Sequence, residues 1–115
     1  MMHCIKYNFI TYVLKIKNYL NIGNYRYLMK QKIRFLKALA DETRMKIVLH
    51  LLDKEKCACT IYPVVGRAQS TVSEHLAILE KAGILRSRKV GKNIWYEVKS
   101  RKAREILKIL DIKKI

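Results

Sequence analysis

The chain has 115 residues and a formal net charge of +16, from 25 Lys and Arg against 9 Asp and Glu. This length fits a single domain with one core. Half of the residues are hydrophobic, which is enough to bury a core and is not typical of a disordered chain. A surface this basic attracts polyanions, so nucleic acid is the first partner that the charge predicts. A basic surface that serves only solubility is the alternative.

Several classes of protein lack support in the sequence. Glycine-rich phosphate loops, paired carboxylates and a nucleophile next to a base are missing, so we do not expect an enzyme. No secretory signal is visible, and no apolar run approaches the roughly 20 residues of a membrane span. Three cysteines do not make a disulfide framework, which predicts reduced thiols in the cytoplasm.

The N-terminal part predicts one amphipathic helix over 3–20, because apolar side chains recur there at helical spacing, and it ends near 21–24. This helix is basic without acidic residues. A role at a membrane surface is therefore an alternative to packing on the protein body or on a second subunit. We predict a helical arm over 1–27 and the main domain over 28–115, with Met29 as an alternative start of the folded domain.

Helical periodicity predicts four helices in the main domain, over 28–40, 42–53, 61–65 and 70–82. Asp41 and Thr60 are placed to be N-caps, because their side chains can accept hydrogen bonds from the free amides of the first turn. Pro63 is compatible with the first turn of the short helix, and Gly66 ends that helix. A short helix, a turn with glycine and a longer helix are typical of a helix-turn-helix.

Two strands are expected over 84–90 and 93–98, joined by a hairpin turn at Gly91-Lys92. A last helix follows, with Ala103, Ile106, Leu107 and Leu110 on its apolar face. The predicted fold is mainly α with a small β-hairpin, a winged helix-turn-helix.

The recognition helix presents short polar side chains at its N-terminal end: Gln69, Ser70, Thr71, Ser73 and His75. Hydroxyls near a helix N-terminus suit phosphate, Gln69 suits adenine, and a neutral His75 can donate or accept at a base edge. Structural alternatives remain for four of these residues, Thr71 included. Ser70 is also a candidate N-cap, Ser73 a member of a capping pair, and His75 a half-buried structural histidine.

The hairpin predicts a second DNA contact, because its tip is basic. Residues 84–102 carry seven basic side chains and one acidic one, whereas 60–83 are neutral. We expect Arg88, Lys89 and Lys92 to reach phosphates or a minor groove. A solvated hairpin is the alternative.

Three blocks within 36–98, LADETR, STVSEHL with the following AGIL, and RKVGKNIWYEV, resemble the arsenic-repressor/SmtB (ArsR-type) family of winged-helix regulators. The resemblance implies a homodimer that forms through N- and C-terminal helices. It also implies binding to an imperfect palindrome in double-stranded operator DNA, repression by default, and release by an effector.

Cys57 and Cys59 occupy the place of the C-x-C pair of arsenic- and cadmium-responsive members. Side chains at i and i+2 of an extended segment point to one side, so both sulfurs can reach one soft ion. Lys54 and Lys56 favour the thiolate form. The effector that the resemblance implies is As(III) or a soft divalent ion such as Cd, Pb or Zn.

The chain also departs from that family. Tyr62 stands where the arsenic-responsive subset has a third cysteine, so Cys4 of the N-terminal arm is our tentative third ligand. The C-terminal zinc site is excluded, because Ser100 and Lys102 hold its leading positions and 103–115 has no histidine. A member without metal sensing, either redox-responsive at the cysteines or without a small effector, and an architectural DNA-binding protein are the alternatives.

Overall fold

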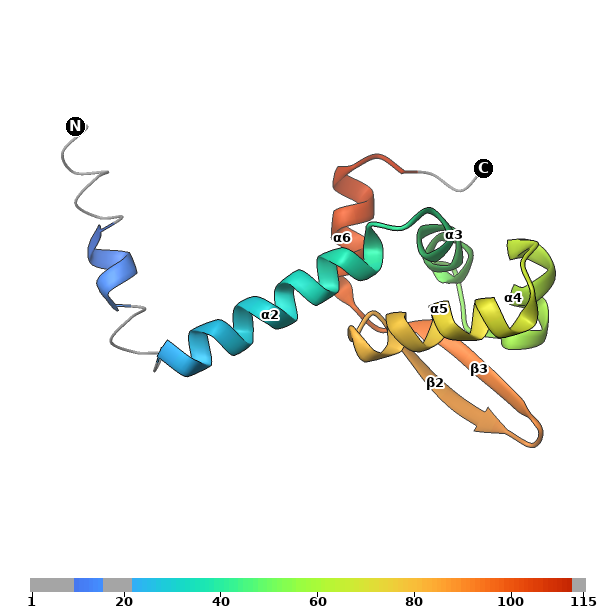
Figure 1. Cartoon of the computed structure of the whole chain (residues 1–115). Helices are drawn as coiled ribbons and strands as arrows, with labels where there is room; N and C mark the ends of the chain where they lie inside the picture. The colour runs from blue at the N-terminus through green and yellow to red at the C-terminus, as the bar shows by residue number, and fades with distance from the viewer. Residues whose placement is uncertain (1–9, 16–21, 113–115) are drawn as a thin grey trace. The chain divides into compact units, whose positions relative to one another are not determined.

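The computed structural model describes residues 10–15 and 22–112 (Figure 1). The chain divides into two compact units, Met1–Ile33 and Arg34–Ile115. Residues 10–15 are helical and belong to the predicted 3–20 helix, whose other residues lie outside the described part. The remaining elements are α2 (Ile22–Leu39), α3 (Glu42–Leu51), β1 (Lys56–Cys57), α4 (Ala58–Val65), α5 (Gln69–Lys81), β2 (Leu85–Val90), β3 (Asn93–Val98) and α6 (Arg101–Ile109).

The predicted start of this helix at residue 28 was wrong, because α2 begins six residues earlier, at Ile22. The expected stop at 21–24 relied on Gly23 and Asn24. One glycine costs a helix only about 1 kcal/mol, and the good helix formers that follow offset this cost. The helix α2 continues through the predicted boundary between residues 27 and 28. The division into an arm and a main domain at this boundary stays a prediction. Near its end, Leu36 is 55 % exposed while Leu39 is 4 % exposed.

The core forms where α3, α5 and α6 meet the base of the hairpin. Its fully buried side chains include Ile47, Val48, Leu51, Ile61, Val72, Leu76, Leu79, Ile84, Leu85 and Leu107. Arg104 of α6 donates to the Leu52 carbonyl at 2.7 Å and to the Val98 carbonyl at 3.3 Å. One side chain therefore joins the last helix to the end of α3 and to β3.

The helix α4 begins three residues earlier than predicted, and its N-cap is Cys57 rather than Thr60. Thr60 lies inside the first turn, where its hydroxyl donates to the Cys57 carbonyl at 2.7 Å. Pro63 is therefore in the second turn, where it leaves the Cys59 carbonyl without its usual amide donor. The predicted stop is confirmed, because Gly66 has a φ of 67° and ends the helix in the left-handed conformation.

The helix α5 begins at Gln69, and the residue at its N-cap position, Ala68, makes no side-chain capping bond. The alternative in which Ser70 is the N-cap is therefore wrong, and this hydroxyl is exposed in the first turn. The N-terminus of α5 therefore has no side-chain cap. Its first backbone amides stay free to donate to an anion, as at other anion-binding helix ends.

The predicted hairpin of β2 and β3 is confirmed, with a positive φ at Gly91 in the turn. A third strand, β1, was not predicted; it pairs antiparallel with β3 and completes the order β1-β3-β2. Cys57 thus lies opposite Trp95, which lies opposite Arg88 on the next strand. The fold is a winged helix-turn-helix, mainly α with a small antiparallel sheet. Within the described residues, no helix is long and apolar enough to cross a membrane.

Candidate DNA interface and cysteine pair

The N-terminal end of α5 carries the five polar side chains that the sequence singled out. Gln69, Ser70 and Ser73 are exposed, and Thr71 and His75 are half-buried. Thr71 and His75 are four residues apart, so they share one face of the helix. This end combines free amides, hydroxyls and an imidazole with no acidic residue in the first turn, an arrangement that suits phosphates and base edges.

His75 is not an isolated polar group on this helix. Its Nδ1 lies 3.2 Å from a guanidinium nitrogen of Arg44, which belongs to the first turn of α3. Arg44 is the last residue of the LADETR block, and no local pattern predicted a role for it. The two residues are 31 positions apart, so only the packing of α3 on α5 could reveal the contact.

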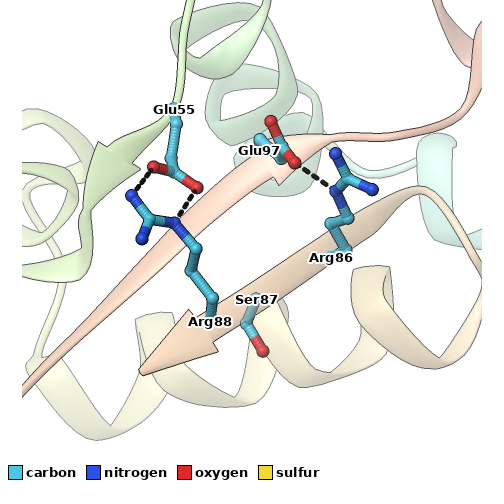
Figure 2. A pocket seen from close by; sticks show the side chains of 5 residues that line it. All are labelled: Glu55, Arg86, Ser87, Arg88 and Glu97. Atoms are coloured by element: carbon cyan, nitrogen blue, oxygen red, sulfur yellow. Dashed lines mark hydrogen bonds and ion pairs between the residues drawn. The ribbon is translucent and has the colours of Figure 1, made fainter. Parts of the chain in front are cut away.

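Exposed basic residues extend along the hairpin that forms the wing. Lys89 and Lys92 have no acidic partner within the part of the chain that the structure describes. Arg88 differs, because its guanidinium forms a two-point ion pair with Glu55, with Nη2–Oε1 at 2.6 Å and Nε–Oε2 at 2.7 Å (Figure 2).

The ion pair of Glu55 and Arg88 stabilises the charged form of both groups. The hydrogen bond from Arg88 lowers the pKa of the Glu55 carboxyl, and the hydrogen bond to Glu55 raises the pKa of Arg88. On the same face of the sheet, Arg86 pairs with Glu97 of the neighbouring strand (Figure 2). Two of the basic side chains in the hairpin are thus already neutralised by carboxylates.

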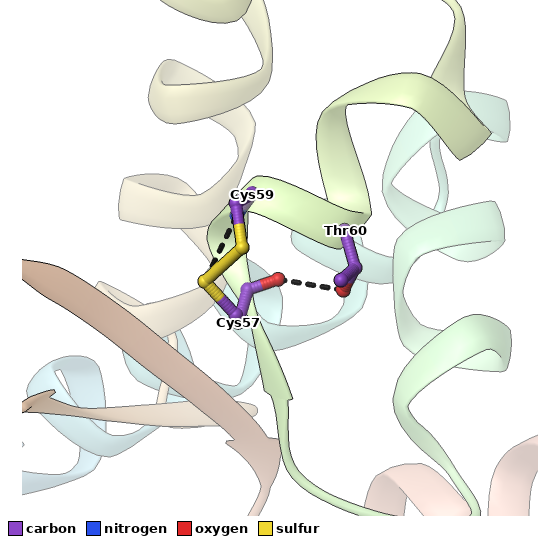
Figure 3. The surroundings of a disulfide bond; sticks show 3 residues. All are labelled: Cys57, Cys59 and Thr60. Carbon is purple, nitrogen blue, oxygen red and sulfur yellow. Dashed lines mark hydrogen bonds between the residues drawn. A yellow bond between two sulfur atoms is a disulfide. The ribbon is translucent and has the colours of Figure 1, made fainter.

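The two cysteines are joined by a disulfide in the structure (Figure 3). The expectation that both cysteines lie in an extended segment is wrong. Only Cys57 is extended; Cys59 lies in the first turn of α4, and their Cα atoms are 5.2 Å apart. The turn brings the sulfurs together, and the Cys59 amide donates to the Cys57 sulfur at 3.3 Å. Cys57 is 5 % exposed, whereas Cys59 faces solvent.

The described residues supply at most two sulfur ligands for a soft ion, and only after reduction. Within 10–15 and 22–112, no group of three or more His, Cys, Asp or Glu side chains could hold a metal. Tyr62, at the position of the third family cysteine, has its hydroxyl 3.5 Å from that of Ser73 on α5. Cys4 lies outside the described residues.

Two other side chains that the sequence analysis considered in connection with metal binding have structural contacts. The Lys56 ammonium, expected to favour thiolate, donates to the His50 carbonyl at 2.6 Å and pairs with Asp53 at 3.1 Å. Ser100, at the excluded zinc site, caps α6 by accepting from the Ala103 amide at 3.1 Å. Neither contact adds a ligand to a metal site.

Residues 41–87 match the family described as "Bacterial regulatory protein, arsR family". The arsenical resistance operon repressor of Escherichia coli is 39 % identical over 69 % of this chain and 68 % of its own length. The cadmium resistance regulatory protein CadC of Listeria innocua is 37 % identical over 65 % of this chain and 64 % of its own. The structure of reduced HlyU from Vibrio cholerae has a TM-score of 0.66 at 27 % identity, covering 77 % of this chain and 94 % of that one.

Proposed function

Because the chain belongs to the ArsR family of transcriptional regulators, we propose that it is a sequence-specific repressor that binds operator DNA as a homodimer in the cytoplasm. The observation that carries this proposal is the exposed polar end of α5 beside a wing with a basic tip. Hydroxyl, amide and imidazole groups suit base edges in the major groove, while Lys89 and Lys92 suit phosphates. The chain is a regulator and not an enzyme.

An architectural protein that coats DNA without regard to sequence is the rival for the +16 charge. The test is a comparison of affinities at equal salt, between a duplex selected by the protein from a randomised library and an unselected duplex. A specific repressor prefers its selected site by about 10³-fold or more at physiological salt. Equal affinity for both duplexes would support the hypothesis of an architectural protein and contradict the proposal of a sequence-specific repressor.

The proposed effector site is the reduced pair of Cys57 and Cys59, which would bind As(III) or a soft ion such as Cd, Pb or Zn. Two related regulators with arsenical and cadmium resistance in their names support this chemistry. Thiolates select soft ions, and β1 and α4 carry the two sulfurs directly before the recognition helix. A third ligand has to come from elsewhere, and Cys4 is the candidate.

The disulfide favours a second candidate effector, an oxidant such as hydrogen peroxide. In that reaction the two thiols lose two protons and two electrons to the peroxide, which leaves as two molecules of water, while the sulfur–sulfur bond forms. Oxidation would change the chain where β1 passes into α4, next to Tyr62 and its contact with Ser73. A related regulator has been described in a reduced state.

The two effectors are distinguished by titrating the selected duplex with protein kept reduced, with reduced protein plus arsenite, cadmium, lead or zinc, and with protein oxidised by peroxide. Release by an ion supports metal sensing, and release by peroxide alone supports redox sensing. The control is Cys57→Ser/Cys59→Ser, which should bind DNA in every arm. If neither treatment changes the affinity, the sensor proposal fails while DNA binding stands.

A further inference from the structure

One arginine connects three helices at the back of the recognition helix. The Nε of Arg44 donates to the Ala38 carbonyl at 2.7 Å, and Nη2 donates to the Lys37 carbonyl at 3.2 Å. Both carbonyls belong to the last turn of α2, where they lack partners within the helix. The remaining Nη1 lies 3.2 Å from Nδ1 of His75.

The backbone of Arg44 is also held in place by a hydrogen bond. Its amide donates to the Asp41 carboxylate at 2.9 Å, the capping bond of α3. The residue is half-buried, so its guanidinium has little freedom to choose another geometry. Three partners other than His75, on α2 and at the start of α3, therefore set the position of Nη1 against His75.

The hydrogen-bond donors of Arg44 determine which nitrogen of the His75 imidazole carries the proton. A guanidinium carries five N–H donors and no acceptor, and it stays protonated in proteins. A hydrogen bond between Arg44 and Nδ1 of His75 therefore requires a lone pair on Nδ1. An imidazole with a proton on Nδ1 would set two donors against each other at 3.2 Å. With Nδ1 as the acceptor, the proton of the ring lies on Nε2.

We propose that Arg44 holds His75 in the tautomer with the proton on Nε2, so that the recognition helix presents a hydrogen-bond donor to DNA. Nε2 lies across the ring from Nδ1 and is therefore turned away from Arg44. This donor selects acceptors, which on DNA are purine N7, guanine O6, thymine O4 and the phosphate oxygens. It disfavours the amino groups of adenine and cytosine. Arg44 is a positioning residue, and its role rests on the proposed DNA-binding function.

The tautomer can be read without DNA, from the imidazole nitrogens of the full-length ¹⁵N-labelled protein at pH 7.5. The spectrum of His75→Gln identifies the His75 signals among those of the three histidines. We expect a bare Nδ1 and a protonated Nε2. A proton on Nδ1 overturns the proposal, and so does a doubly protonated ring. Arg44→Met should raise the share of rings protonated on Nδ1, and an unchanged share would mean that Arg44 does not set the tautomer; if this variant does not fold, Arg44→Lys is measured in its place.

The donor is tested with two isosteres of His75 on the duplex selected from the randomised library. Glutamine carries its amide NH₂ about as far out as Nε2, whereas asparagine reaches only the position of Nδ1. We expect His75→Gln to bind within about three-fold of wild type and His75→Asn to bind about ten-fold more weakly, the effect of one lost hydrogen bond to DNA. Equal affinity of the two variants contradicts a donor at Nε2.

The acceptor is found by replacing each purine in turn with its 7-deaza analogue and each phosphate near the site with a methylphosphonate. One substitution should weaken wild type by about ten-fold and leave His75→Asn unchanged. A deazapurine effect assigns a base contact, and a methylphosphonate effect assigns a phosphate contact. If no position behaves this way, His75 does not donate to DNA.

The two levels of the proposal fail separately. If the library yields no preferred duplex, the proposed sequence-specific function fails, and the DNA role of His75 fails with it. The nitrogen spectrum then still shows whether Arg44 sets the tautomer. If a duplex is selected but the tautomer is wrong, the proposed function stands and this inference does not.

Discussion

Asp41 stabilises the start of α3 through one short hydrogen bond, at 2.9 Å from its carboxylate to the Arg44 amide. Replacing an N-cap aspartate by alanine costs about 1 kcal/mol, while asparagine preserves most of the cap. We therefore expect Asp41→Ala to lower the free energy of unfolding by about this amount and Asp41→Asn to lower it by less. Urea unfolding at pH 7 measures both variants. Equal losses would mean that the carboxylate charge matters more than the cap.

The same carboxylate predicts a dependence on pH. The hydrogen bond from the Arg44 amide, aided by the Arg44 charge and opposed by partial burial, lowers the pKa of Asp41 in the folded state. Its stabilisation is therefore complete above the ordinary aspartate pKa of about 3.9 and is lost as pH falls below it. The difference in unfolding free energy between wild type and Asp41→Ala should shrink below about pH 4. A constant difference down to pH 2 would contradict this assignment.

Among the contacts of individual residues, those between near neighbours in the sequence could be predicted. Asp41 was identified as a cap because its amide partner is three residues away. Thr60 met the same local criterion and failed, because Cys57 took the cap when pairing of β1 with β3 started the helix earlier. The contact of Arg44 with His75 had no local signal, since it depends on how two helices pack.

The wing and the segment that precedes the cysteines are joined by Glu55 and Arg88. This pair engages the guanidinium of Arg88, which the sequence predicted as a DNA contact, and we expect it to compete with phosphate for this side chain. In Glu55→Gln the acid is lost, so Arg88 becomes free to contact phosphate. Each added phosphate contact steepens the dependence of log affinity on log salt by about 0.9, and we expect this increase together with tighter binding at low salt.

The control for Glu55→Gln is Glu105→Gln, which changes the net charge equally but lies on α6 and pairs with Arg101 at 3.3 Å. Binding isotherms of the selected duplex across a salt series compare the two. If both variants steepen the salt dependence alike, the effect is one of total charge, and Glu55 does not mask Arg88.

Elements with strong periodicity or a turn signal were predicted well, and short or tertiary ones were not. The hairpin followed from its glycine turn and alternating pattern, and α5 was placed within one residue. The strand β1 has only two residues and forms only because it pairs with β3, so no local sequence pattern could predict it. The disulfide was missed for a related reason, because the start of α4 at Ala58 turns Cys59 toward Cys57.

Over the described part of the molecule, several apolar residues that the core does not use lie on α2 and α6, the helices predicted to dimerise. Leu36 of α2 is 55 % exposed, and Ile109 and Leu110 of α6 are 81 % and 58 % exposed. Helical periodicity placed Leu110 on the apolar face of the last helix, but the core of a single chain does not cover it. A second copy of the chain is the partner that the family predicts for such a surface.

Association should therefore depend on Ile109. A large apolar side chain that becomes buried contributes about 1.5–3 kcal/mol, so replacing it with a charge should raise the dissociation constant of the dimer at least about ten-fold. Sedimentation equilibrium of Ile109→Glu measures this constant. The control is Val64→Glu, which places the same charge at a side chain of α4 that is 58 % exposed and should leave association unchanged. A monomeric wild type, or an unchanged constant for Ile109→Glu, would mean that α6 is not part of a dimer interface.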